Sequence, residues 1–68
     1  MEDFQQRLLE EQKELSEKIG KLLDFVGTEN FKALSPLKKN LLETQLCIMQ
    51  SYSMVLFMRI MEENIEVG

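Results

Sequence analysis

The chain has 68 residues, 44% of them hydrophobic, and a formal net charge of −4 at pH 7. A chain this short buries only about 60% of its unfolded surface, and with one cysteine and no histidine it has neither an internal disulfide nor the commonest metal ligand. We therefore expect one domain over residues 1–68 that is supported by self-association, and the acidic balance argues against binding to a nucleic-acid polymer.

Residues 3–26 carry the pattern of a long amphipathic helix. Apolar side chains recur at spacings of four and three and form a stripe with one polar position, Gln12, namely Leu8, Leu15, Ile19, Leu22 and Val26. Phe4 extends this stripe toward the N-terminus. On the solvent-exposed face, a glutamate precedes a lysine by four residues at Glu14–Lys18 and at Glu17–Lys21. This is the favourable order for ion pairs along a helix.

A short helical turn is predicted over residues 28–34. Gly27 should end the first helix as a C′ glycine. Thr28 can then cap the turn, which offers Phe31 and Leu34 to a hydrophobic core.

The final helix is predicted over about residues 36–64. Ser35 followed by Pro36 is a strong helix-start signal, because proline suits the first helical position. The predicted fold is therefore all-α, an antiparallel helical hairpin with a short connecting helical turn that assembles as a compact homo-oligomer.

Two apolar stripes run along this final helix. The first stripe comprises Leu42, Leu46, Met49, Ser53, Leu56 and Ile60. The second stripe comprises Leu41, Gln45, Ile48, Tyr52, Val55 and Arg59. A hairpin can cover only one of them, so we infer that the other packs against sister chains. The alternative is a monomeric three-helix core that wraps the final helix.

The same helix is not expected to cross a membrane. Its most apolar stretch, residues 46–61, is shorter than the roughly 20 predominantly apolar residues of a membrane span, and polar side chains interrupt it at Gln50, Ser51, Ser53 and Arg59. Cys47 is interpreted as a small core residue. Five methionines, a single cysteine and no signal-peptide pattern favour the cytoplasm.

Catalysis has little support in the sequence. We find no histidine, no serine or cysteine with a partner base, no glycine-rich phosphate loop and no metal-ligand spacing, so we expect neither an enzyme nor a cofactor. The carboxylates of Glu10, Glu11 and Glu14 are interpreted as a solvated helix face.

Several side chains suit a small anionic ligand with aromatic bases. Phe4 offers a ring on which a base can stack, although it could instead cap the hairpin core. Lys18 and Lys21 could contact phosphate oxygens, or pair with the glutamates one turn earlier. Thr28 lies where a helix N-terminus presents free backbone N–H groups.

Arg59 is unusual because it lies on an apolar stripe. A charge buried between subunits is costly unless a carboxylate or an anionic ligand pairs with it. The alternatives are a salt bridge to Glu62 or Glu63, or extension of the side chain toward solvent.

Nearly the whole chain, from Phe4 to Ile60, carries a family resemblance. The segments FQQRLLEEQKELSEKIGKLLDFV and FKALSPLKKNLLETQLCIMQSYSMVLFMRI resemble the small phage anti-CBASS sponge proteins, whose helical-hairpin domain is shared with the anti-Thoeris sponges. The resemblance implies a homohexamer that binds cyclic dinucleotides such as cGAMP between pairs of protomers, and in many members cyclic trinucleotides around the three-fold axis. The messenger is held intact in the host bacterial cytoplasm during phage infection, and CBASS effectors stay inactive.

The resemblance also implies ligand-binding residues. Phe4 matches a base-stacking aromatic that is usually a tyrosine, and Arg7 belongs to the adjoining QQR mark. Lys18, with Lys21 as the alternative, matches a lysine that contacts phosphate, and Thr28 matches a threonine near the turn.

Arg59 matches the arginine of the family's final RI pair, which the resemblance places in the trinucleotide pocket. A function of another class also fits the sequence. A small helical oligomer of scaffold or antirepressor type could use a methionine-rich face to bind a protein partner.

Overall fold

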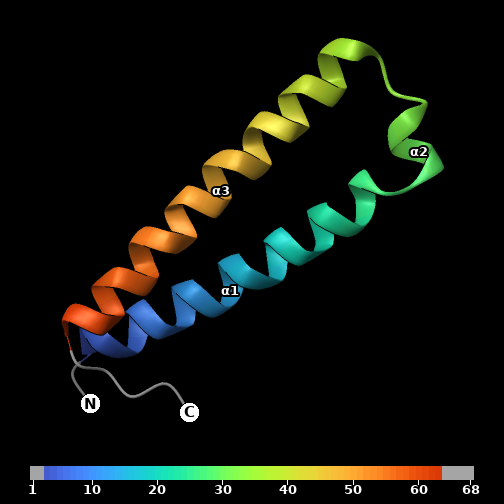
Figure 1. The fold of residues 1–68 in the computed structure, drawn as a ribbon. Helices are drawn as coiled ribbons and strands as arrows, with labels where there is room; N and C mark the ends of the chain where they lie inside the picture. The colour runs from blue at the N-terminus through green and yellow to red at the C-terminus, as the bar shows by residue number, and fades with distance from the viewer. Residues whose placement is uncertain (1–2, 64–68) are drawn as a thin grey trace.

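The computed structural model describes residues 3–63, and the fold within them is a helical hairpin (Figure 1). Helix α1 spans Asp3–Val26, the short α2 spans Glu29–Lys32, and α3 spans Pro36–Glu62. In Figure 1, α1 and α3 run in opposite directions and α2 lies at the turn between them. The described part of the chain contains no strand, so the all-α prediction is confirmed there; the predicted helix end near Asn64 lies outside it.

Helix α1 ends directly before Gly27, as predicted, but without the left-handed conformation that is usual for a glycine at this position. The N–H of Gly27 donates to the carbonyl oxygen of Asp24 at 3.2 Å, and that of Thr28 donates to the carbonyl oxygen of Phe25 at 3.0 Å. Gly27 does not adopt a positive φ. Bonds between residues three apart tighten the last turn instead, and this geometry needs no glycine.

Thr28 and Ser35 cap the two helices that follow, as predicted. The Thr28 hydroxyl accepts from the N–H of Phe31 at 3.3 Å and donates to the carbonyl oxygen of Phe25 at 2.6 Å. The Ser35 hydroxyl accepts from the N–H of Lys38 at 3.3 Å. Each cap gives a partner to an N–H group that the first helical turn leaves open.

The hydrophobic core joins α1 to α3 in the half of the hairpin nearest the termini. It consists of Leu8, Leu15, Leu56 and Ile60, and Leu56 is completely buried. All positions of the first stripe of α3 are buried or half-buried, whereas all positions of the second stripe are exposed. The hairpin therefore covers one stripe, as predicted, and leaves the other open in the single chain.

A polar pair lies within this helix contact. The Gln12 side-chain amide donates to the Ser53 hydroxyl at 3.2 Å. Gln12 and Ser53 are the polar positions of the two facing stripes, so their pairing satisfies both groups. A slide of one turn would separate them and leave two part-buried polar groups without this bond, which favours the observed register.

At the far end, Phe31 of α2 closes the turn. Phe31 is buried and meets the edge of the Phe25 ring with centroids 6.0 Å apart and planes at 86°. Edge-to-face rings at this separation attract each other beyond their simple burial. The contact holds α2 against the end of α1.

The single chain is a rod. Its extents are 46 × 17 × 15 Å and its radius of gyration is 14.9 Å, compared with about 11 Å for a globular chain of this length. A rod of two helices buries few side chains. This shape favours the expectation that other copies of the chain complete the core.

The uncovered surface of α3 is strongly apolar. Its exposed large apolar side chains are Leu37, Leu41, Ile48, Tyr52, Met54, Val55, Phe57, Met58 and Met61. Cys47 is also exposed, so its interpretation as a core residue is wrong for the single chain. The reason is that α3 has more apolar positions than one facing helix can cover. Within residues 3–63, no helix is both long and apolar enough to span a bilayer.

Candidate ligand-binding site

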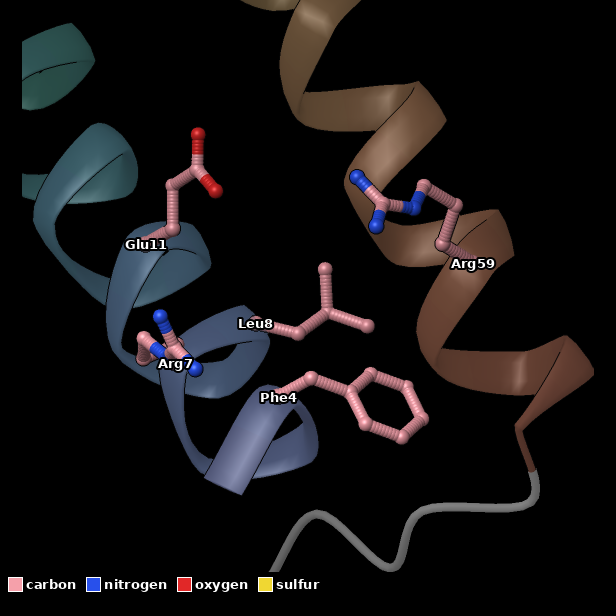
Figure 2. Close-up of a pocket in the computed structure, with 5 residues that line it drawn as sticks. All are labelled: Phe4, Arg7, Leu8, Glu11 and Arg59. Carbon is pink, nitrogen blue, oxygen red and sulfur yellow. The ribbon is translucent and has the colours of Figure 1, made fainter. Parts of the chain in front are cut away.

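A surface pocket at the terminal end of the hairpin brings together three of the predicted site residues. It has a volume of about 260 Å³ and is lined by Phe4, Arg7, Leu8, Glu11 and Arg59 (Figure 2). Each of the four residues from α1 lies three or four positions from two of the others, so they share one helix face. Arg59 comes from α3, across the hairpin.

The side chains from the two helices point toward one another. In Figure 2, the Phe4 ring and the Leu8 side chain extend from α1 toward α3, and the Arg59 guanidinium extends back toward α1. Leu8 is buried and forms an apolar floor, whereas 46% of Phe4 is exposed. Phe4 is therefore not sealed into the core of the single chain, and its ring is accessible to a ligand.

Both arginines of the chain line this pocket. Together with Glu11 they give its lining a formal net charge of +1. Among the described residues the one ion pair joins Lys32 to Glu29, so neither Arg7 nor Arg59 is paired with a carboxylate. Two planar guanidinium groups are therefore available to an anion, and such groups suit the paired oxygens of a phosphate.

The alternatives weighed for Arg59 can now be compared. The alternative of a salt bridge to Glu62 or Glu63 is not realised within residues 3–63. Arg59 is exposed in the single chain, so its charge carries no burial cost there. Such a cost would arise only where another chain covers the second stripe.

Lys18 and Lys21 line a different pocket, in the middle of the hairpin. This pocket has a volume of about 350 Å³, and its lining consists of Lys18, Lys21, Leu22, Phe25, Gln45 and Met49. Neither lysine pairs with the glutamate one turn before it in the described structure. Fourteen residues of helix separate Phe4 from Lys18, or about 21 Å. One chain therefore does not bring these two residues to the same small ligand.

Thr28 lies at the opposite end of the hairpin from Phe4. Its hydroxyl already donates one hydrogen bond and accepts another in capping α2. A hydroxyl has one proton, so Thr28 has only acceptor capacity left for a ligand. Its position in the single chain marks it as a structural cap.

The pocket includes two residues that the sequence did not single out as binding residues. Glu11 follows Phe4 by seven positions and Arg7 by four, so helical spacing alone could have placed it on this face. Leu8 belonged to the predicted stripe as a core residue. Glu10, Glu11 and Glu14 are exposed, as predicted for a solvated face, and no cluster of ligating side chains within residues 3–63 could hold a metal ion.

Comparison with known proteins adds one match. The model of the Sequestin family matches residues 2–62, which include both long helices and both pockets. No curated protein and no solved structure shows significant similarity to the chain.

Proposed function

The chain belongs to the Sequestin family, and from this membership we propose that it binds and sequesters a cyclic oligonucleotide messenger without cleaving it. The family's name fits a sequestering role and agrees with the resemblance to sponge proteins. The observation that carries the proposal is the pocket of Phe4, Arg7 and Arg59, in which an accessible aromatic ring lies beside two guanidinium groups that pair with no carboxylate of residues 3–63.

The two kinds of side chain match the two parts of a nucleotide. An aromatic ring stacks on any base and contributes about 1–3 kcal/mol. A guanidinium donates two parallel hydrogen bonds to phosphate oxygens. Phe4 would hold a base, and Arg7 and Arg59 would hold a phosphate. Leu8, which is buried, would form the apolar base of the pocket.

Two chains are needed to complete the site. The pocket volume of about 260 Å³ lies below the range of about 300–1,000 Å³ that is typical of small-ligand sites. A cyclic dinucleotide has two bases and two phosphates, and a two-fold pair of chains supplies two Phe4 rings and two sets of arginines. Where two α1 helices pair in opposite directions, Lys18 or Lys21 of one chain can also reach the ligand held by Phe4 of the other.

Assembly would use the exposed second stripe of α3. We propose that this stripe packs against sister chains in a homohexamer, as the resemblance implies. Sequestration requires slow release and abundance, and most affinity differences between related complexes arise from the off-rate. The protein would act in the host bacterial cytoplasm during phage infection, where loss of free messenger keeps CBASS effectors inactive; it would not be an enzyme.

Calorimetry with a panel of cyclic dinucleotides, including cGAMP, and cyclic trinucleotides tests this proposal. We expect binding at micromolar concentration or tighter, with a linear dinucleotide as the control for the cyclic shape. Ligand released by denaturing the complex should be intact. Absence of binding by every cyclic nucleotide would overturn the proposal, and recovery of linear product would indicate an enzyme.

Replacing Arg59 with alanine should weaken cyclic dinucleotide binding about 10- to 150-fold. This range corresponds to a lost hydrogen bond between charged groups of about 1.5–3 kcal/mol. The reason is that Arg59 shares its pocket with Phe4 in the single chain. Arg59→Lys keeps the positive charge but loses the planar guanidinium, so it should weaken dinucleotide binding less than Arg59→Ala does.

The same variant decides whether Arg59 serves a second pocket. Calorimetry of Arg59→Ala is run with a cyclic trinucleotide as well as the dinucleotide. If only trinucleotide binding is lost, the shared pocket is wrong and the two ligands occupy separate sites.

A protein-binding module is the second candidate. It is favoured by the exposed methionines of α3, Met54, Met58 and Met61, because flexible methionine side chains adapt to varied partners. A closed homohexamer buries apolar surface against itself. A monomer that leaves these methionines exposed in solution would favour the protein-binding candidate.

A further inference from the structure

A carboxylate lies in the candidate pocket beside both arginines, yet it pairs with neither. Glu11 lines the pocket and follows Arg7 by four positions along α1, while Arg59 faces it from α3. Carboxylates and guanidinium groups form strong two-pronged hydrogen bonds where their geometry permits. A free Glu11 carboxylate would therefore compete with a phosphate for the two cations.

A hydrogen bond from the facing helix holds Glu11 instead. The Tyr52 hydroxyl donates to Oε2 of Glu11, from a position two turns before Arg59 on α3. Tyr52 is the sole tyrosine of the chain. The bond crosses the hairpin, so it turns the carboxylate of Glu11 toward α3 and away from the guanidinium of Arg7 on its own helix.

The next residue pair fixes the register that this contact needs. Gln12 and Ser53, each one position later, are joined by the polar bond within the helix contact. Both cross-helix bonds therefore depend on the same alignment of α1 with α3. The order of Arg7 before Glu11 also weakens their competing pair, because an acid before a base is the favourable order on a helix.

From these contacts we infer that Tyr52 is a positioning residue, which holds the Glu11 carboxylate off Arg7 and Arg59 so that both guanidinium groups stay available to an anionic phosphate ligand. The inference rests on the proposed function of the same pocket. It gives the single tyrosine a role in ligand affinity although it need not touch the ligand.

The test uses a cycle of three variants of the full chain, Tyr52→Phe, Glu11→Gln and the double variant, measured by calorimetry with cGAMP. Tyr52→Phe removes only the hydroxyl and should weaken binding about two- to fivefold, the range set by a competing exposed ion pair. Glu11→Gln removes the competitor and should bind at least as tightly as the unmodified chain. In the Glu11→Gln background, adding Tyr52→Phe should then leave the affinity for cGAMP unchanged.

That rescue separates positioning from a merely structural role. If Tyr52→Phe weakens binding equally in both backgrounds, the hydroxyl acts by another route and the inference is wrong. Circular dichroism melting of each variant checks that the helices remain intact.

A second readout needs no ligand. The chain has only two arginines, so the side-chain Nε–H signals of Arg7 and Arg59 are readily assigned by NMR. In the unliganded Tyr52→Phe variant, at least one signal should shift as Glu11 pairs with it, and should return in the double variant. If no cyclic di- or trinucleotide binds to any form of the chain, the proposed function fails, while these shifts still decide the role of Tyr52. Unchanged signals in Tyr52→Phe would overturn the inference.

Discussion

Replacing Phe4 with alanine should weaken cyclic dinucleotide binding about 5- to 150-fold while the protein still folds and assembles. The range corresponds to the loss of one base-stacking contact of about 1–3 kcal/mol. Phe4 is nearly half exposed in the single chain and lines the pocket of the two arginines, so its ring contributes little to the core. Calorimetry measures the affinity, and light scattering measures the assembly.

Two conservative variants separate stacking from packing at the same position. Phe4→Tyr keeps the ring, restores the residue that most sponge proteins have there, and should bind normally. Phe4→Leu keeps apolar bulk without a flat ring and should bind as poorly as Phe4→Ala. Loss of the assembly in Phe4→Ala would show instead that Phe4 is a packing residue.

Replacing Ile48 with glutamate should break the assembly. Ile48 lies on the second stripe of α3 and is 63% exposed in the single chain, so the hairpin itself tolerates the change. At an interface between chains the new carboxylate would lose its water without gaining a partner, at a cost of several kcal/mol. Native mass spectrometry should then show monomers or dimers at concentrations where we expect the unmodified chain to form a hexamer.

A matched control lies on the same helix. Gln50 is exposed and outside both stripes, so Gln50→Glu adds the same charge without touching the proposed interface. Its assembly should be unchanged. If Ile48→Glu also assembles normally, the second stripe is not the contact between chains.

Helix positions and the buried face of α1 were predictable because they depend on local signals. The spacing of Leu8 and Leu15 predicts which face of α1 is buried, and both are buried. Ser35 with Pro36 predicts the start of α3. The sequence left open which of the two α3 stripes packs against α1, and the structure buries the stripe whose single polar residue, Ser53, bonds to Gln12.

Predictions that depended on contacts outside the local sequence were less accurate. The helix end at Gly27 was predicted correctly, but the bonds that close it join residues three apart and do not use the left-handed glycine that is usual at such an end. Cys47 was placed in a core on its apolar neighbours, although it lies outside both stripes. Composition near a residue does not say which side of a helix that residue occupies.

The candidate site shows the same division. Phe4 and Arg7 could be grouped from their spacing on one helix. Arg59 joins them only through the hairpin register, and so does the Tyr52 hydroxyl that holds Glu11. The family resemblance placed Arg59 and Phe4 in different pockets, and contacts between helices leave no periodic signal in the sequence that would have joined them.

Native mass spectrometry with and without cGAMP tests the central claim most directly. We expect a closed homohexamer that gains the mass of intact cyclic dinucleotide, with one ligand for each pair of chains. An unchanged mass in the presence of each cyclic di- and trinucleotide, or a gain that corresponds to linear product, would contradict it.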